Sequence, residues 1–403
     1  MWAVDLQPFW SSDLCHDRQN GIRRGDQSLE TLMTFNPDLW ILINMCVGIA
    51  FTALLFYRFP KLPPAETSKD YPTVSIIIPA RNEEKNLQLL LEDLKTQSIK
   101  PHEIICVNDD SSDNTAGVAQ TFGATLINLD SKPEGWTGKT WACQNGADLA
   151  SGSLLLFLDA DVRLRKDGLA RIVQAHQAAD CSISVQPFHT AREPYEQFSF
   201  LFNLVQIAAN GTSLPRKTNI GVHGPVLLIA KADYEKIGGH ASVRQCIVED
   251  MVFGQKLQQN HLPYQLFVGD QDVSYRMYPG GLRSLVQGWV KNFAFGATKT
   301  HPLILLMIIL WFGSMITVPI YLVLSVGNAN LPMIAVYGLL YLLWVFVLGS
   351  LANRIGRFHV LPIIFFPLLV AGFLLIFIVS LITKVFGLPV TWKGRVIAGE
   401  DET

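Results

Sequence analysis

The chain has 403 residues, of which 49% are hydrophobic and 16% charged, against about 25% charged residues in an ordinary soluble domain. Lys and Arg number 32 and Asp and Glu 34, so the formal net charge is −2, which argues against a nucleic-acid partner. Residues 58–300 hold 24 basic and 25 acidic side chains, whereas residues 301–383 hold only Arg354 and Arg357. We therefore expect a soluble domain joined to a membrane part, which excludes a purely cytosolic enzyme and a pure channel or transporter.

The first predicted element is a membrane helix at residues 39–57. This segment has no charge, and as a helix it is long enough to cross a hydrocarbon core of about 30 Å. Arg58 and Lys61 follow it, so the positive-inside rule puts its C-terminal end in the cytoplasm. Residues 1–38 are too acidic and too long for the start of a signal peptide, and we interpret them as an N-terminal extension before an uncleaved anchor.

Residues 73–279 alternate short apolar runs with helical patterns, which predicts an α/β domain whose sheet is covered on both faces. The apolar runs 74–78, 103–107 and 154–158 each lead into polar or acidic residues. Open α/β sheets bind ligands beyond the carboxyl ends of their strands. We therefore expect the functional site at that edge of the sheet.

The strongest motif is Asp159-Ala160-Asp161, directly after the apolar run 154–158. At an extended strand end both carboxylates face the same side, where they can hold a hard cation, Mg²⁺ or Mn²⁺, that also binds phosphate oxygens. Such a cation would neutralise charge on a departing diphosphate. A cap or turn role for the two aspartates is the alternative.

A second acidic pair, Asp109-Asp110, follows the apolar run 103–107. A carboxylate there can accept hydrogen bonds from a nucleobase or from ribose hydroxyls, and the alternative is a turn or a cap for the next helix. Residues 79–84 fill the first turn between strand and helix without the G-x-G-x-x-G pattern of dinucleotide binding. A nicotinamide or flavin enzyme is therefore disfavoured.

Two further segments carry candidate chemistry. Residues 135–139 contain two glycines that admit a ligand close to the backbone, and Lys139 can reach a phosphate; the alternative is a flexible turn with a solvated lysine. Glu249-Asp250 opens the helical run 251–260. Either carboxylate could act as a general base toward an attacking hydroxyl, or could only complement the helix dipole.

Residues 280–300 combine apolar, aromatic and basic side chains at helical spacing, which predicts an amphipathic helix in the membrane interface. A plain core helix is the alternative. Within this segment we assign Gln287 and Trp289 to the acceptor side of the site.

Residues 301–383 contain three apolar segments, at about 302–325, 331–351 and 361–383, followed by a tail at 384–403. If all segments cross, the loop with Arg354 and Arg357 is cytoplasmic, in agreement with the positive-inside rule, and so is the α/β domain. Full crossing would leave the basic tail outside, however, so a re-entrant last segment remains open. The residues behind this alternative are the tail cations Lys384, Lys393 and Arg395 and the helix breakers Pro362, Pro367 and Gly372.

Taken in order, residues 75–84, 107–115, 158–161 and 249–250 resemble family 2 glycosyltransferases of the GT-A fold. The resemblance covers about residues 73–300. It implies an α/β GT-A mixed sheet with helices on both faces, here with transmembrane helices added. It also implies a nucleotide-sugar donor (a UDP-hexose or another NDP-sugar), a divalent cation (Mg²⁺ or Mn²⁺) and inversion at the anomeric carbon.

The resemblance carries over to individual positions. It implies a catalytic base at Asp250 with Glu249 beside it, and a metal and diphosphate motif at Asp159 and Asp161. Donor-binding roles fall on Pro79, Arg81, Glu84, Asp109, Asp110, Lys139 and Asp159.

Two departures from the family pattern matter. The stretch 109–115 is one residue shorter than the common form, so the register after Asp110 is open. The Q-x-x-R-W signature of processive synthases is only partly present in residues 287–289, which argues against a polymerase.

Residues 133–139, 237–240 and 392–395 narrow the resemblance to membrane glycosyltransferases of carotenoid and hopanoid pathways. This match implies an integral protein of the plasma or inner membrane with a cytoplasmic catalytic domain. Its acceptor would be a hydroxyl or carboxyl of a membrane lipid, with a carotenoid preferred on overall likeness. The alternatives are a hopanoid or polyisoprenyl phosphate acceptor, or a non-catalytic membrane scaffold that retains the fold.

Overall fold

The computed structural model describes residues 37–66, 70–216, 220–246, 248–296, 300–392 and 395–397. Residues 1–36 of the expected N-terminal extension, and Lys393 and residues 398–403 of the tail, lie outside the described residues. The chain divides into two units, Met1–Cys46 and Val47–Thr403. Everything described below about the site lies within the second unit.

The α/β domain is built on a seven-stranded sheet in the order β3-β2-β1-β4-β8-β6-β9. Neighbouring strands pair in parallel except at β8, which is antiparallel to both β4 and β6. The sheet is therefore mixed, as expected. The strands are β1 Val74–Ala80, β2 Glu103–Asp109, β3 Thr125–Leu129, β4 Leu154–Leu158, β6 Ser182–Gln186, β8 Val226–Ala230 and β9 Tyr264–Val268.

Helices cover both faces of this sheet because alternate residues of each central strand point to opposite sides. Ile76 and Ile78 of β1 join one core cluster, with residues from α3 (Glu84–Lys95), α4 (Thr115–Thr121) and α6 (Gly168–Ala179). Ile77 joins the other cluster. That second cluster includes residues from α5 (Gly138–Leu149), α8 (Lys231–Lys236), η2 (His240–Val243) and α9 (Glu249–Gln259).

A four-stranded sheet, in the order β11-β7-β10-β5, joins the α/β domain to the apolar C-terminal part. Its short strand β11 (Gly356–Arg357) comes directly after the long apolar helix α12 and pairs with β7 (Phe188–Thr190). The loop that carries Arg354 and Arg357 is thus attached to the α/β domain. The other elements here are β5 Val162–Leu164, β10 Val273–Tyr275, η1 Pro194–Phe198 and α7 Ser199–Ala209.

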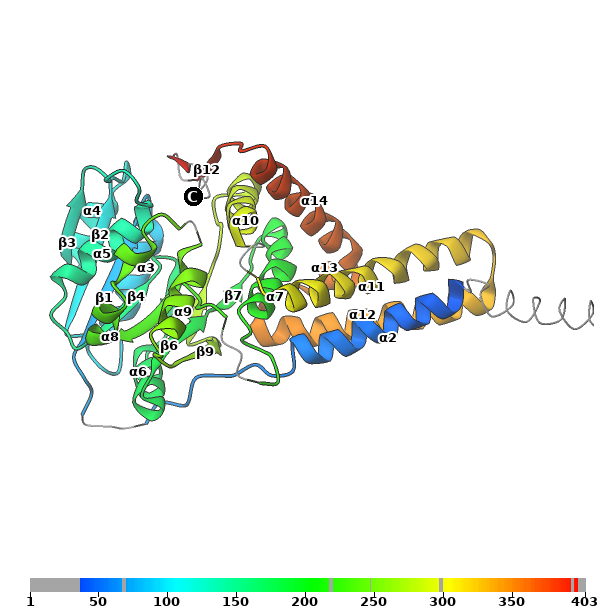
Figure 1. The fold of residues 1–403 in the computed structure, drawn as a ribbon, viewed down its shortest axis with the longest axis horizontal. Helices are drawn as coiled ribbons and strands as arrows, with labels where there is room; N and C mark the ends of the chain where they lie inside the picture. Colours follow the sequence, from blue (N-terminus) through cyan, green and yellow to red (C-terminus); the bar gives the residue numbers. More distant parts are fainter. Residues whose placement is uncertain are drawn as a thin grey trace, which may run out of the picture. The chain divides into compact units, whose positions relative to one another are not determined.

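Among the described residues, three helices are long and apolar enough to cross a membrane: α11 (Pro302–Gly327), α12 (Leu331–Ile355) and α14 (Phe366–Val385). The expected first membrane helix is α2 (Pro37–Leu55), whose apolar part, Trp40–Leu55, is shorter. Helices α11 and α12 contact each other and run side by side away from the α/β domain (Figure 1).

Helix α14 follows a different course. Tyr341, in the middle of α12, donates a hydrogen bond to the carbonyl oxygen of Ile364 (2.6 Å) in α13 (Val360–Ile364), just before α14 begins. Near the other end of α14, the Ser380 hydroxyl donates to the carbonyl oxygen of Val290 (2.9 Å) in α10 (Leu282–Gly296). The strand β12 (Val390–Trp392), which pairs with β13 (Arg395–Ile397), also contacts α10.

The segment between β11 and β12 therefore leaves the α/β domain, reaches the middle of α12 and returns to the α/β domain along α10 (Figure 1). Helix α14 is nevertheless also long and apolar enough to cross a membrane, so a spanning and a re-entrant last segment both stay predictions.

Candidate active site

A single cavity of about 2320 Å³ lies at the carboxyl edge of the seven-stranded sheet and extends toward the apolar helices. Pro79, Asp109 and Asp159, which end or follow β1, β2 and β4, all line it. Glu249 and Asp250, at the start of α9, line it as well. Segments more than a hundred residues apart in the sequence therefore meet in one cavity.

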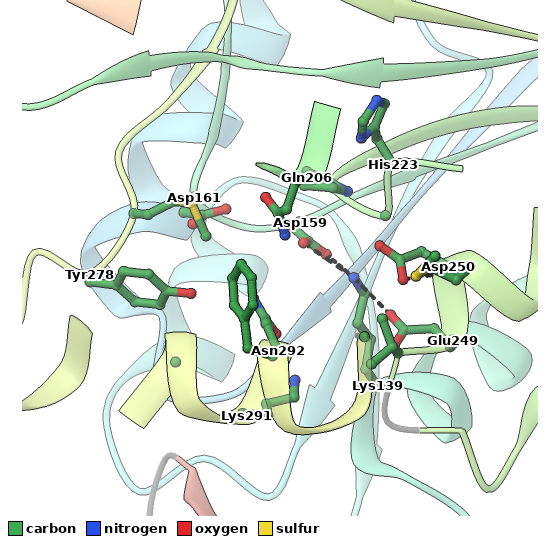
Figure 2. A pocket seen from close by; sticks show the side chains of 18 of the residues that line it. Lys139, Asp159, Asp161, Gln206, His223, Glu249, Asp250, Tyr278, Lys291 and Asn292 are labelled. Atoms are coloured by element: carbon green, nitrogen blue, oxygen red, sulfur yellow. Dashed lines mark hydrogen bonds and ion pairs between the residues drawn. The ribbon is translucent and has the colours of Figure 1, made fainter. Parts of the chain in front are cut away.

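At the centre of the cavity, Lys139 bridges two acidic motifs (Figure 2). Its ammonium group lies 2.9 Å from Oδ1 of Asp159 and 3.1 Å from Oε1 of Glu249. Lys139 is in the first turn of α5, which begins after Thr137, whose hydroxyl accepts a hydrogen bond from the backbone N–H of Thr140. Burial alone would lower the pKa of Lys139, but the two carboxylates raise it well above its usual value, so this residue is a fixed positive charge.

Asp250 lies beside this bridge and has a different electrostatic state. Burial and, second, the neighbouring Glu249 carboxylate raise the pKa of Asp250 to about 7. Burial also acts to raise the pKa of Glu249, but Lys139 and Lys291 lower it below its usual range. Two adjacent carboxyl groups whose pKa values are driven apart are typical of acid–base sites, and Asp250 is the one tuned to exchange a proton near neutrality.

The second aspartate of the Asp159-Ala160-Asp161 motif also lines the cavity. Buried Tyr278 faces it, and burial, then Asp161 and Asp159, raise the pKa of the Tyr278 hydroxyl. Among the residues that the structure describes, no group of three His, Cys, Asp or Glu side chains is placed to hold a metal ion. Asp159 and Asp161 both line the cavity, and carboxylate oxygens are the ligands that a hard cation takes together with phosphate oxygens.

At the far end of the sheet edge, Pro79, Arg81, Glu84 and Asp109 line the cavity as expected. Asp110 does not. The chain turns with φ 52° at Asp110, and its carboxylate, 57% exposed, lies 3.3 Å from the Arg81 guanidinium instead. Arg81 also donates to the carbonyl oxygens of Asp109 (2.6 Å) and Asp110 (2.7 Å). Asp109 is thus the member of the pair that lines the cavity, and the donor-binding role of Asp110 stays a prediction.

The two acceptor-side candidates on α10, Gln287 and Trp289, are not among the residues that line the cavity, and their role stays a prediction. Trp289 is fully buried, stacks on Phe202 with ring centroids 4.6 Å apart, and donates its indole N–H to the Ser199 hydroxyl (3.2 Å). The apolar face of α10 is thus packed against protein, as in the core-helix alternative. The cavity is lined instead by the face that carries Ser284, Gly288, Lys291 and Asn292.

The sequence could have indicated that these residues share one face of α10, since positions 284, 288, 291 and 292 recur at helical spacing. It held no comparable signal for the wall formed by Gln206, Asn210 and His223. His223 Nδ1 lies 3.2 Å from Asn210 Nδ2, and its Nε2 lies 2.8 Å from the Thr212 hydroxyl. Burial lowers the pKa of His223 to about 3, so this histidine is neutral and does not compete with Asp250 as the base.

The other half of the cavity is apolar and is lined by three helices, α10, α11 and α14. Phe293 of α10 lies with its ring centroid 5.5 Å from that of Phe373 in α14, and Phe312 of α11 stacks on the same ring at 4.5 Å. Ile309 of α11 is 57% exposed, so this half reaches the surface of the apolar helices. We call it the apolar corridor; its lining residues are Phe293, Leu305, Ile308, Ile309, Phe312, Gly313, Ile316, Phe373, Leu374 and Phe377.

Comparison with known proteins agrees with these features. The glycosyl transferase family 2 model matches residues 75–225. The 4,4'-diaponeurosporenoate glycosyltransferase of Staphylococcus aureus is 36% identical over 366 residues, which are 89% of this chain and 96% of that protein. Its counterpart from Staphylococcus haemolyticus is 36% identical over 345 residues, 84% of this chain and 91% of that protein.

Similarity to solved structures is weaker. The mannosyltransferase PcManGT from Pyrobaculum calidifontis, in complex with GDP-Man and Mn²⁺, is 15% identical, with a TM-score of 0.48, and the match covers 85% of this chain and 99% of that chain.

Proposed function

The chain belongs to glycosyl transferase family 2 and is a glycosyltransferase, and from this premise we propose that it moves a hexose from a nucleotide sugar to a membrane-dissolved carotenoid. The proposed acceptor group is a terminal carboxyl or hydroxyl. The relatives that are 36% identical are named for a carotenoid carboxylate, diaponeurosporenoate, and this supports a carotenoid over a hopanoid or a polyisoprenyl phosphate.

The observation that carries the proposal is the continuity of the cavity. The acidic cluster around Asp159 and Asp250 and the apolar corridor between α11 and α14 line the same space. A polyene is insoluble in water, so an enzyme that glycosylates it must admit it from the bilayer to the reacting atoms. A cavity that is acidic at one end and apolar at the other is suited to that task.

For the donor, we propose that the nucleoside lies against Pro79, Arg81, Glu84 and Asp109. The Asp109 carboxylate supplies a hydrogen-bond acceptor for base or ribose groups. The diphosphate would lie near Lys139. The ammonium group of Lys139 pairs with two carboxylates in the protein alone, and it would also pair with phosphate oxygens when the donor is bound. The donor sugar would then lie between Lys139 and the start of α9.

We further propose that Asp159 and Asp161 hold a divalent cation, Mg²⁺ or Mn²⁺, together with the diphosphate. When bound, this cation neutralises charge on the departing diphosphate. In the protein alone, the Lys139 ammonium pairs with Asp159 and offsets part of the negative charge that the cation would offset when bound.

The proposed reaction is a direct displacement. An acceptor oxygen attacks the anomeric carbon from the face opposite the diphosphate, which inverts the configuration, and the electron pair of the broken C–O bond leaves with the nucleoside diphosphate. A hydroxyl acceptor would give its proton to Asp250. An ionised carboxyl acceptor carries no such proton and depends less on a base.

The proposed membrane topology rests on the positions of the basic residues that flank the apolar helices, relative to the α/β domain. The strand β11, which holds Arg357, pairs with β7, and α14, which holds Lys384, contacts α10, so we propose that Arg354, Arg357 and Lys384 lie on the same side of the membrane as the α/β domain. The positive-inside rule then supports a cytoplasmic catalytic domain in the plasma or inner membrane, where nucleotide sugars are available.

The test is a direct assay of the purified full-length protein in lipid nanodiscs. It would be incubated with a panel of nucleotide sugars, Mg²⁺ or Mn²⁺, and nanodisc lipids containing either a C30 carotenoid acid, a hopanoid or a polyisoprenyl phosphate. Mass spectrometry of the extracted lipids should show a hexose added to the carotenoid, with inverted anomeric configuration by NMR. Transfer to the hopanoid or the polyisoprenyl phosphate alone would refute the carotenoid acceptor, and hydrolysis without transfer to any lipid would refute the lipid acceptor altogether.

A further inference from the structure

Helix α10 forms the wall that the two halves of the cavity share. Ser284 and Gly288, in its first half, line the cavity near Tyr278. Phe293, near its end, belongs to the aromatic wall of the apolar corridor, with its ring centroid 6.2 Å from that of Phe377. Lys291 lies between these positions and also lines the cavity. An acceptor that enters along the corridor therefore passes Lys291 as it reaches the acidic cluster.

The charges around this point are unbalanced. Asp159, Asp161 and Glu249 line the cavity here together with Asp250, which is partly protonated near neutrality because its pKa is about 7, against the ammonium groups of Lys139 and Lys291. Lys139 already bridges Asp159 and Glu249. An acceptor that brings a further negative charge into this cluster needs a nearby cation to offset the repulsion.

Lys291 has the electrostatic character that such a partner requires. It is largely enclosed by protein, and burial lowers its pKa, whereas the surrounding carboxylates, Glu249 first, act in the opposite direction. In turn, Lys291 helps to lower the pKa of Glu249. Figure 2 shows its side chain leaving α10 beside Asn292, on the opposite side of the cavity from Asp250. A buried ammonium group gains more from a charged ligand than an exposed one, because water screens it less.

We propose that Lys291 is the acceptor-binding residue that receives the terminal carboxylate of the polyene where the apolar corridor meets the acidic cluster. This proposal rests on the proposed function and adds to it a residue that selects the acceptor's end group. The carboxylate pairs through one oxygen with the Lys291 ammonium, and its other oxygen attacks the anomeric carbon. The new bond is a glycosyl ester, the bond to the diphosphate breaks with its electron pair, and no proton is transferred.

The experiment compares Lys291→Met with the wild-type protein in nanodiscs, with saturating donor and two acceptors: a C30 polyene acid and the matching primary alcohol. We expect the KM for the acid to rise on the order of 10- to 100-fold, the usual effect of losing a hydrogen bond to a charged group. The KM for the donor should stay within about twofold. Lys291→Arg should recover most of the loss, because it keeps the charge.

A matched control is Lys85→Met, which removes a cation from the nucleotide end of the same cavity. That variant should leave the KM for the acid unchanged, so that the effect is specific to position 291. Lys291→Gln serves as a second variant if Lys291→Met unfolds at a lower temperature than the wild-type protein.

The outcomes separate this proposal from the function on which it rests. An unchanged KM for the acid in both neutral variants refutes the role of Lys291, as does an equal rise for acid and alcohol. A rise confined to the KM for the donor would assign Lys291 to the diphosphate and refute its role toward the acceptor. Absence of transfer to either polyene by the wild-type protein would instead refute the proposed function.

Discussion

Gly224 offers the sharpest test of where the reaction occurs. It lines the cavity between the two acidic motifs, and a Cβ atom added there would lie 3.2 Å from the Lys139 ammonium nitrogen and 3.6 Å from Oδ2 of Asp250. Its φ lies outside the left-handed region, so alanine causes no backbone strain at this position. Gly224→Ala therefore inserts one methyl group between the proposed diphosphate partner and the proposed base, and changes nothing else directly.

The size of the effect follows from these distances. A contact of 3.2 Å is tight, so Lys139 must move by a few tenths of an ångström and lengthen its 2.9 Å and 3.1 Å ion pairs. The methyl group also takes up space beside Asp250 that an acceptor oxygen needs, since proton transfer requires an approach of about 2.6–3.2 Å. A misplacement of about 1 Å can cost on the order of 10²-fold, so for a shift of a few tenths of an ångström we expect turnover to fall by about tenfold.

Stability should change little, because the tight contact with Lys139 opposes the gain from a less flexible unfolded chain. Where alanine fits the native backbone, replacing glycine raises the free energy of unfolding by about 0.4–1 kcal/mol, because the unfolded chain loses conformational freedom. Gly349→Ala, in α12, is the matched control, since a Cβ atom there meets nothing within 4 Å.

The assay measures turnover of the polyene alcohol in nanodiscs, because only a hydroxyl acceptor gives its proton to Asp250, with the unfolding temperature determined for each variant. Gly349→Ala should keep full turnover, and both variants should unfold within a few degrees of the wild-type temperature. Wild-type turnover in Gly224→Ala would mean that the reacting atoms do not pass between Lys139 and Asp250. A large drop in its unfolding temperature would show that the loss is structural and would contradict the reasoning.

Three further predictions follow from the same geometry. Asp159→Asn should lower turnover by on the order of 10²-fold and raise the Mn²⁺ concentration that gives half-maximal rate; a metal titration in which only the maximal rate changes would remove Asp159 from the metal site. Because burial and Glu249 raise the pKa of Asp250 to about 7, the ionised base is lost as the pH falls through 7. The kcat/KM for transfer to a hydroxyl acceptor or to water should thus fall about tenfold per pH unit well below 7. If Asp250→Asn shows the same fall at low pH, the titrating group is a residue other than Asp250. Gly313→Trp should fill the apolar corridor, since a Cβ atom there meets nothing within 4 Å. It should raise the KM for the polyene at least about tenfold and leave hydrolysis of the donor unchanged. Equal loss of polyene transfer and donor hydrolysis would contradict a dedicated acceptor path.

Much of the fold could be predicted because its signals are local. The apolar runs that became β1, β2 and β4 lie on consecutive residues, and Leu87, Leu90, Leu91 and Leu94 of α3 recur at helical spacing and are all buried. The family was also predictable, because short motifs occur in a fixed order, and the comparisons confirm it.

The sequence predicts less where a side chain's direction depends on distant contacts. Asp110 and Asp109 are equivalent in the sequence, and only the positive φ at Asp110 and its contact with Arg81 turn one of them away from the cavity. Trp289 was assigned to the acceptor side because it belongs to the amphipathic segment 280–300, beside which the acceptor was expected to enter. Its position is set by its contact with Phe202, 87 residues earlier in the chain, and the spacing of residues within α10 does not reveal that contact.

The path of α14 bears on how the proposed acceptor, a molecule dissolved in lipid, would reach the catalytic domain. Phe373 and Phe377 of α14 form the corridor wall opposite Phe293 and Phe312. If α14 crossed the membrane beside α12, its aromatic face would leave α10, and the acidic cluster would open to water at that end. Each Å² of polyene surface exposed there would cost about 25 cal/mol. Because α14 contacts α10, the apolar corridor stays enclosed up to Lys291, and only the end group of the proposed acceptor would need to leave an apolar environment.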